Sequence, residues 1–362
     1  MTHMRSVLAV LVTPIAALLC SLVIGALVIL ASGASPIDAY VALFQGAFGS
    51  QEALGHTIEN ATPLILTGLA VAFAFRGGLF NIGADGQFYA GAVTAAWAGV
   101  ALQLPAHGGL FLALLVGALA GGMLGALAGY LKGAFGAHEV VTTIMLNFIM
   151  IDLANWLLLG PLSAHSQVPG STIIPTTNQL PALSTGLGGA HWGFIIAVLA
   201  AVACYVVLWR TPIGMDLRVA GLAPKAARYS GMLPTVGAVL SLGIGGMFAG
   251  LAGAGEVLGT YGHMTVPFVA NLGFLGIGVA LLGRNHPLGC VIGGIILGGL
   301  AAGGQQLQFQ VGLSAHLADI LVGVILLLVT ARTLGFRWRR ARDGRRLPSV
   351  DHLPVQGDRG AS

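Results

Sequence analysis

Apolar stretches long enough to cross a lipid bilayer recur along almost the whole of this 362-residue chain. A membrane-spanning helix needs about 20 apolar residues, or somewhat fewer where neighbouring helices bury it. By this rule we expect ten spans. They cover residues 7–31, 61–75, 88–104, 109–131, 140–159, 192–209, 235–258, 268–283, 288–304 and 317–331. The pattern predicts an all-α fold, a polytopic membrane helix bundle with about ten transmembrane helices.

The composition excludes a soluble domain, because charged residues make up 8% of the chain, against roughly 25% in ordinary soluble domains. The three cysteines, Cys20, Cys204 and Cys290, all lie in apolar stretches. Their spacing fits neither a metal site nor a disulfide framework, so we expect no metal. The net charge of +4 comes from loops and the tail. It therefore indicates membrane orientation and not nucleic-acid binding.

The positions of the basic residues predict the orientation of the bundle. With a cytoplasmic N-terminus, the ten spans place all 16 Lys and Arg residues on the inner side or at inner span ends. The expected outer segments contain none; they are 32–60, 105–108, 160–191, 259–267 and 305–316. Because cytoplasmic loops are enriched in Lys and Arg, both termini are expected to be cytoplasmic. Residues 1–335 form the expected membrane domain, and 336–362 a basic, disordered tail lying near anionic membrane lipid.

Glycines recur every four residues in the fourth expected span, at Gly117, Gly121, Gly125 and Gly129. Pairs with the same spacing occur at 246 and 250, 289 and 293, and 294 and 298. A stripe of small residues lets another backbone approach closely. The stripes predict tight helix packing and carry no chemistry.

Residues 210–234 interrupt the apolar pattern with a basic, structured loop, TPIGMDLRVAGLAPKAARYSGMLP after Arg210. Its core, 220–231, is expected to form a short helix with Pro224 in the first turn and Gly231 as its end. Two interpretations remain open. The loop is either an ordinary positive-inside connection or a docking element for another protein.

A second unusual segment, RGGLFNIGADGQ at 76–87, places glycines and polar residues between two apolar stretches. Asn81, Gly83, Asp85, Gly86 and Gln87 are its candidate functional residues. A backbone break at membrane depth is tolerated where protein or a water-filled cavity satisfies the exposed groups. The alternative is a plain cytoplasmic turn between two helices.

Polar residues also occur within the fifth expected span. At 100° per residue, Asn147, Asp152 and Asn155 cover about 140° of one side, and Thr143 extends this stripe. Because a half-polar face in lipid is costly, we expect it to line a transport pathway or to bond a neighbouring helix. Glu256, near the outer end of its span, is a further candidate for pathway lining or for a solvated interface.

Catalytic signatures do not occur in the sequence. It contains no HExxH zinc motif, no G-x-S-x-G elbow and no G-x-x-x-x-G-K-[ST] phosphate loop. We therefore expect no catalytic residue, no ATPase site and no cofactor in this chain.

Five stretches together resemble the permease subunits of ATP-binding-cassette importers, in the group that includes branched-chain amino acid and simple-sugar permeases. They are GLFNIGADGQFYAGA at 78–92, EVVTTIMLN at 139–147, WRTPIGMDLRVAGLAPKAARYSGM at 209–232, AGLAGAGEVLGT at 249–260 and GFLGIGVALLGRNHPLG at 273–289. The nucleoside and simple-sugar branch is the most similar. The chain departs from the pattern at Ala223, where Asn is frequent, and at Leu275, where Asp is frequent.

The resemblance implies an assembly in the bacterial plasma (inner) membrane. Its expected partners are a cytoplasmic ATPase that binds the ATP, a second permease subunit of the same or a paralogous sequence, and an extracytoplasmic solute-binding protein. The loop at 210–234 would be the element that couples to the ATPase. Its candidate residues are Arg218, Ala220, Gly221, Pro224, Ala226, Arg228 and Gly231.

The function that follows is import of nucleosides first and simple sugars second. Asn147 and Asn155 would offer hydrogen bonds to the cargo, and Phe80, Phe88 and Tyr89 would offer rings on which a base stacks. The alternative is an ion-coupled secondary transporter of a small polar solute, with Asp85, Asp152 and Glu256 as coupling sites.

Overall fold

The computed structural model describes residues 22–102, 104, 108–223, 227, 229, 231, 233–268, 271–312, 314, 319–320 and 323–324. Within them the regular structure is helical, and β-pairing is limited to isolated bridges in the loops. Most of the expected first and tenth spans, and the tail at 336–362, lie outside the described residues.

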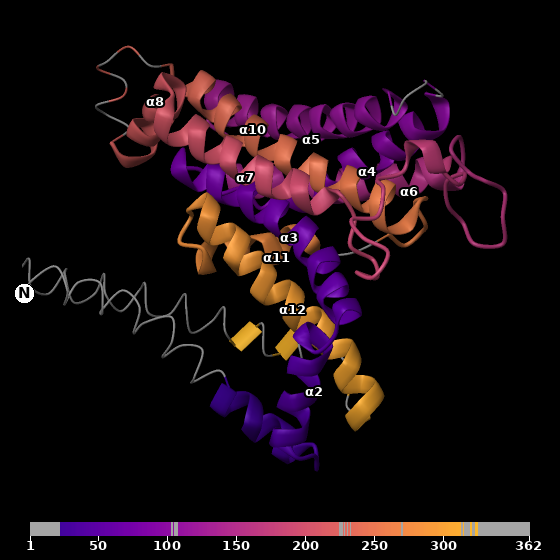
Figure 1. Cartoon of the computed structure of the whole chain (residues 1–362). Coiled ribbons are helices and arrows are strands. Elements are labelled where there is room, and N and C mark those ends of the chain that lie inside the picture. The colour runs from indigo at the N-terminus through magenta and orange to yellow at the C-terminus, as the bar shows by residue number, and fades with distance from the viewer. Residues whose placement is uncertain are drawn as a thin grey trace, which may run out of the picture.

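The helices follow one another along the chain with mostly short connections (Figure 1). Their bounds are α2 Pro36–Phe48, α3 Gln51–Arg76, α4 Ala84–Ala101, α5 Gly108–Phe135, α6 Glu139–Leu159, η1 Thr176–Asn178, α7 Gly193–Arg210, α8 Pro212–Leu222, α10 Pro234–Gly255, η2 Glu256–Tyr261, α11 Leu272–Leu282 and α12 Pro287–Val311. A further helix, Leu22–Ala31, precedes α2 and is bent against it by 118°.

Six of these helices are long and apolar enough to cross a membrane, or seven if the bent pair forms one span. The expected count of ten is therefore reached only in part within the described residues. The eighth expected span is α11, whose 11 residues extend over about 16 Å, roughly half of a bilayer's hydrocarbon core. The third expected span is α4, which begins before the apolar stretch, so that its first turn carries the polar residues Asp85 and Gln87.

Helix α3 is much longer than the second expected span, because the helix begins at Gln51 and not at residue 61. The Ser50 side chain caps it by accepting a hydrogen bond from the Ala53 N–H at 3.0 Å. The ten added residues are partly polar, so a search for apolar stretches omits them. Pro63 lies inside this helix and has no N–H to donate to the carbonyl of Glu59.

The predicted glycine stripe is the contact between α5 and α10, which form the most extensive helix pair of the described structure. A Cβ added at Gly121 would lie 2.5 Å from the Gly246 carbonyl oxygen and 2.6 Å from the Gly250 Cα. One added at Gly129 would lie 2.5 Å from the Ala238 carbonyl oxygen. The two backbones therefore touch along the stripe, as the sequence predicted.

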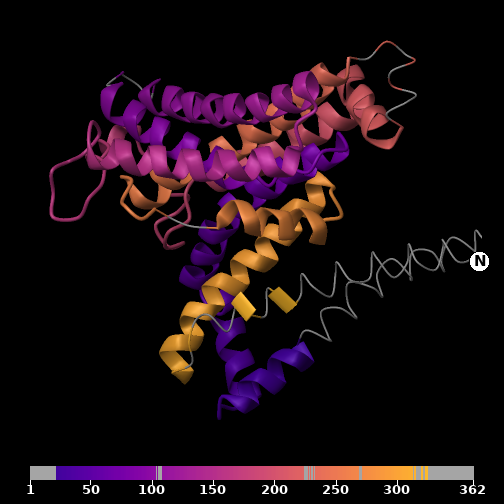
Figure 2. The same cartoon turned by 180° about the vertical axis from the view of Figure 1, so that it is seen from behind.

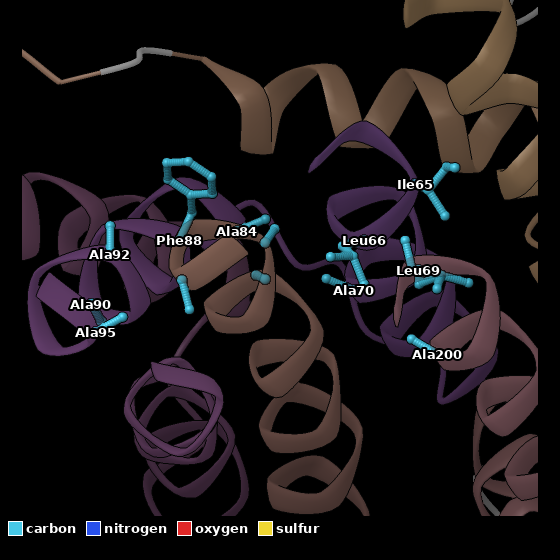
Figure 3. Close-up of a cluster of buried hydrophobic side chains, with 14 of the residues drawn as sticks. Ile65, Leu66, Leu69, Ala70, Ala84, Phe88, Ala90, Ala92, Ala95 and Ala200 are labelled. Atoms are coloured by element: carbon cyan, nitrogen blue, oxygen red, sulfur yellow. The ribbon is translucent and has the colours of Figure 1, made fainter. Parts of the chain in front are cut away.

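Helices α4, α5 and α10 pack together in one block, and α3 leads from it towards α2 and α12 (Figures 1 and 2). Apolar side chains of α3 and α4 fill the core beside them, among them Leu66, Leu69, Ala84 and Phe88 (Figure 3). Helix α8 lies at one end of the block. The loop at 160–191 lies at the opposite end (Figure 1).

That loop is anchored to the segment that follows α10. Backbone hydrogen bonds join Ser171 N–H to the Met264 carbonyl at 2.7 Å and Leu180 N–H to the Leu258 carbonyl at 2.7 Å. His191, buried at the end of the loop, accepts a hydrogen bond at Nδ1 from Gly193 N–H at 3.1 Å, and its Nε2 lies 3.3 Å from the Thr260 hydroxyl. Burial lowers the pKa of His191 to about 4, so the ring is neutral at physiological pH.

Candidate coupling surface and membrane break

The coupling loop begins with α8, a helix that precedes the one expected at 220–231. Thr211 is its N-cap and accepts a hydrogen bond from Gly214 N–H at 3.2 Å, and Pro212 occupies the first helical position. Ala220 and Gly221 lie in the last turn of α8 and not in the helix expected at 220–231, whereas Ala227 and Tyr229 are helical as expected, and the Ala227 N–H donates to the Ala223 carbonyl at 3.1 Å. The Thr-Pro pair at 211–212 is the signal in the sequence that indicates the additional helix α8.

The remaining candidate residues of this loop are only partly described. Pro224, Ala226 and Arg228 lie outside the described residues. Gly231 has φ +86°, a backbone conformation that glycine adopts readily. Arg218 lies on α8, where its Nε–H donates to the Gly214 carbonyl at 3.3 Å.

The last turn of α8 packs directly on the α3–α4 connection. A Cβ added at Gly221 would lie 2.6 Å from the Arg76 carbonyl oxygen, 2.7 Å from the Gly78 nitrogen and 2.9 Å from the Gly77 carbonyl carbon. In return, a Cβ at Gly78, where φ is +76°, would lie 2.6 Å from the Gly221 Cα. The structure therefore joins the two segments that the sequence singled out separately.

Trp209, at the end of α7, gathers several basic groups around this contact. The guanidinium carbons of Arg76 and Arg218 lie 5.1 Å and 5.7 Å from the centre of a Trp209 ring, within cation–π distance. The His286 ring lies 5.1 Å away. Burial and the nearby charge of Arg76 lower the pKa of His286. The ends of α3, α7 and α8 and the α11–α12 turn therefore meet around one indole.

The Arg76 side chain also fixes the α11–α12 turn, because its Nε–H donates to the Asn285 carbonyl at 2.8 Å. Neither Trp209 nor Arg76 was among the candidate residues. An Arg and a Trp at the ends of apolar stretches are common as interface anchors, so their positions in the sequence do not indicate that they meet.

Beyond Gly78 the chain enters the bundle instead of turning at its surface. Asn81 is fully buried, and its amide bonds the Gln87 amide through two contacts of 2.9 Å and 3.2 Å. Its Oδ1 also accepts from Gly83 N–H at 3.0 Å. Asn81 thereby satisfies the Gly83 N–H, a backbone group at the start of α4 that lacks a helical partner.

Helix α6 supplies the other half of this polar junction. The Asn147 amide donates to the Ile82 carbonyl at 2.8 Å and accepts from Gly86 N–H at 2.7 Å. Thr143, one turn away, is fully buried, and a Cβ added at Gly83 would lie 3.0 Å from its Cβ. A larger residue at Gly83 or Gly86 would displace α6, which explains why small residues occupy both positions.

Asp85 lies where the N-termini of α4 and α11 meet. Its Oδ1 accepts from Gly273 N–H at 2.7 Å, and the residue itself is in the first turn of α4. Both helix dipoles stabilise a carboxylate at this point. Because α11 separates Asp85 from the Arg284 end by about 16 Å, the carboxylate lies well inside the bundle.

The polar residues of α6 do not share one face. Its buried residues are Thr143, Asn147, Met150, Ala154 and Leu158. Asp152 is exposed and Asn155 is half-buried. The five-residue step from Asn147 to Asp152 turns about 140° around the helix, which carries the carboxylate to the outer side. The expected single stripe therefore divides into an inner pair and an outer carboxylate.

Two further expectations change with the structure. Phe88 and Tyr89 are buried and pack against Phe268, with ring centres 6.1 Å apart in both pairs. They fill the core and are not free to stack on a cargo. Glu256 lies apart from the break, in the first turn of η2, and is buried instead of solvated.

Comparison with known proteins shows the family of this chain. A family model for the branched-chain amino acid transport system permease component matches residues 55–330. A guanosine ABC transporter permease of Bacillus subtilis is 40% identical over 324 residues, covering 89% of this chain and 93% of the relative. No solved structure matches.

Two other relatives cover similar shares. A glucose ABC transporter permease of Haloferax volcanii is 32% identical over 90% of this chain and 89% of its own length. A nucleoside ABC transporter permease of Lactococcus lactis is 30% identical over 88% of this chain and 90% of its own length. With its apolar helix bundle, the chain belongs to the family of branched-chain amino acid transport system permease components, as a multi-pass transport subunit of the plasma membrane.

Proposed function

We propose that this permease carries nucleosides, or failing that simple sugars, inward at the expense of ATP that a separate subunit hydrolyses. The relatives named for guanosine and for nucleosides support the first cargo, and the relative named for glucose supports the second. The chain itself is proposed to hold neither a cofactor nor a catalytic residue. Membership of an ATP-driven family argues against the ion-coupled alternative.

The contact between Gly221 and Gly78 carries this proposal. Helix α8 presents exposed apolar side chains, with Ile213 51%, Met215 56% and Leu222 88% exposed, which suit a protein partner better than water. Its opposite side touches the backbone that leads to Asp85. A cytoplasmic cassette ATPase that displaces α8 would therefore move the α3–α4 connection directly, without an intervening side chain.

A second permease subunit, identical or paralogous, is proposed to cover the outer face of α6. Asp152 is the fourteenth residue of this helix and so lies about 20 Å from its start. A carboxylate exposed to lipid at that depth is costly. A water-filled pathway shared with the second subunit would remove this cost, with Asp152 and Asn155 lining it and Thr143 and Asn147 holding the break behind it.

The proposed orientation of the bundle in the membrane places the ATPase, the tail and the solute-binding protein. Ten spans with both termini in the cytoplasm would place α8 beside the ATPase, and the basic tail at 336–362 beside anionic lipid. The loop at 160–191 would then face outward, where an extracytoplasmic solute-binding protein docks and delivers the cargo.

Reconstitution tests this function. The permease, its cassette ATPase and its solute-binding protein are placed in liposomes, and accumulation of radiolabelled guanosine, inosine and glucose is measured. We expect accumulation that needs ATP and the binding protein together. Accumulation driven by an ion gradient without ATP would overturn the proposal.

A further inference from the structure

A cavity of about 360 Å³ lies between α3, η2, α11 and α12. This volume is within the range of small-molecule sites, about 300–1,000 Å³. The first turn of α11 separates the cavity from the break, because Gly273 bonds Asp85 while Leu272 and Leu275 line the cavity. Neither the coupling contact nor the break uses this space.

Part of the 160–191 loop lies against the same part of α3. A Cβ added at Gly188 would lie 3.7 Å from the His56 Nε2, and the backbone at Gly189 touches the Glu59 carboxylate. His56 and Glu59, which bond each other at 3.1 Å, line the cavity. The cavity therefore lies in the half of the bundle near this loop and far from α8.

Its charged lining is acidic. Glu59, Glu256 and Asp319 contribute carboxylates, and no Lys or Arg occurs among the described lining residues. Carboxyl oxygens accept hydrogen bonds. A ligand rich in N–H and O–H donors would therefore be favoured, while an anionic phosphate finds no basic partner among the described lining residues.

Glu256 is the residue that requires explanation. It is 6% exposed, lines the cavity, and has the Thr260 side chain as its hydrogen-bond partner within the described part of the chain. A buried carboxylate with so few partners is costly unless a ligand supplies more. The backbone changes from α to π geometry at this residue, and the π segment ends the helix at Tyr261.

The rest of the lining is partly apolar. It includes Leu64, Leu275 and Leu297, and Tyr261, 46% exposed, contributes a ring. An aromatic ring of this kind stacks on nucleobases. The cavity therefore combines a stacking surface, an apolar wall and acceptors for donor groups.

We propose that this cavity is a binding site for a neutral purine nucleoside within a single permease subunit, and that Glu256 accepts hydrogen bonds from the donor edge of its base. Guanine offers two adjacent donors, N1–H and the 2-amino group, to one carboxylate, whereas hypoxanthine offers N1–H alone. Guanosine should therefore bind better than inosine, and guanosine monophosphate should be excluded. This inference rests on the proposed nucleoside import and assigns its cargo a site and a preference.

Occupancy of the cavity can be measured at Gln305, an exposed residue of its lining. Gln305→Cys is introduced after Cys20, Cys204 and Cys290 are replaced by Ser or Ala. The full transporter in membrane vesicles is then labelled with a small thiol reagent without ATP. We expect guanosine to slow labelling, inosine to do so at higher concentrations, and guanosine monophosphate to have no effect.

Glu256→Gln tests the carboxylate in the same background. Replacing one acceptor oxygen by an amino group leaves a donor of the base unpaired, which should raise the guanosine concentration for half-protection roughly 10- to 100-fold, and should reduce the preference over inosine. Glu52→Gln is the matched control, because Glu52 is exposed on α3, the helix that supplies Glu59, and does not line the cavity. The amount of ATPase that copurifies with each variant reports folding and assembly.

The outcomes separate the two proposals. If the wild-type transporter imports guanosine but guanosine does not protect Gln305→Cys, the site is wrong and the function stands. If protection occurs equally in Glu256→Gln and Glu52→Gln, the role of Glu256 is wrong. If the wild-type transporter imports glucose and no nucleoside, both the nucleoside cargo and this site are refuted.

Discussion

Replacing Gly221 by Ala tests whether force passes from α8 to the membrane break through backbone contact. The new Cβ would lie 2.6 Å from the Arg76 carbonyl oxygen and 2.7 Å from the Gly78 nitrogen. Both neighbours are backbone atoms, so no side chain can rotate away. Overpacking of this kind costs about 1–3 kcal/mol. That cost corresponds to a factor of roughly 5 to 150 in the equilibrium between arrangements that keep or break the contact.

The assay is transport and ATP turnover of the reconstituted complex. In Gly221→Ala we expect import to fall at least about fivefold, and ATP hydrolysis to respond less to loaded binding protein, while the permease still reaches the membrane. Gly221→Trp should abolish both responses. Gly243→Ala is the matched control, because its added Cβ would meet the Ala126 Cβ at an ordinary 3.4 Å. Equal import and stimulation in Gly221→Ala and Gly243→Ala would refute direct backbone coupling.

Three further predictions concern the break, the orientation and the loop. Asp85→Leu removes the acceptor of a buried N–H, at a cost of about 1–3 kcal/mol, and should abolish uptake at normal membrane abundance. Asp85→Asn keeps an acceptor oxygen and should retain more uptake; equal uptake in both variants would favour a plain turn. A cysteine at Val168 should react with an impermeant thiol reagent on intact cells, and a cysteine at Leu222 should not. The reverse pattern of labelling would overturn the proposed orientation. His191 has a pKa of about 4 in the folded loop against 6.5 when exposed, so the ring is neutral in the folded protein. The stability of the loop should therefore be full above about pH 6.5 and should fall by up to about 3 kcal/mol towards pH 4. Hydrogen exchange of the loop measures this fall, and a His191→Gln variant whose loop loses protection over the same pH range would contradict the prediction.

Much of the fold follows from the sequence, because a membrane demands long apolar helices and glycine stripes demand a close neighbour. The stripe at Gly121 and Gly125 was predicted from spacing alone and lies against α10. The ends of the helices were harder to predict. The first ten residues of α3 are partly polar and escape an apolar search, although Ser50 is a recognisable cap. The segment around α11 resembles a span in the sequence because its apolar stretch, 268–283, is longer than the helix itself, Leu272–Leu282.

The candidate site could be predicted in parts but not as an assembly. Glycines and amides at 81–87 indicated a break, and Asn147 indicated a polar helix face. That Asn147 bonds this break, and that Gly221 touches Gly78, depend on contacts between residues far apart in the chain, which no local pattern encodes. The placement of Asp152 shows why helical angles alone do not predict burial, since two residues 140° apart around a helix can lie on the same buried face or on different faces.

The glycine contact between α5 and α10 has a mechanical consequence. Where two backbones touch, no side-chain rotamers are available to absorb a displacement, so the pair should behave as a rigid body during transport. Its neighbour α3 carries an internal proline, Pro63, and it contacts α11 and α12 both through backbone, at Gly276 and Gly298, and through side chains such as Ile65 and Val279. Bending during transport should therefore be concentrated at Pro63 in α3, while α5 and α10 keep their contact.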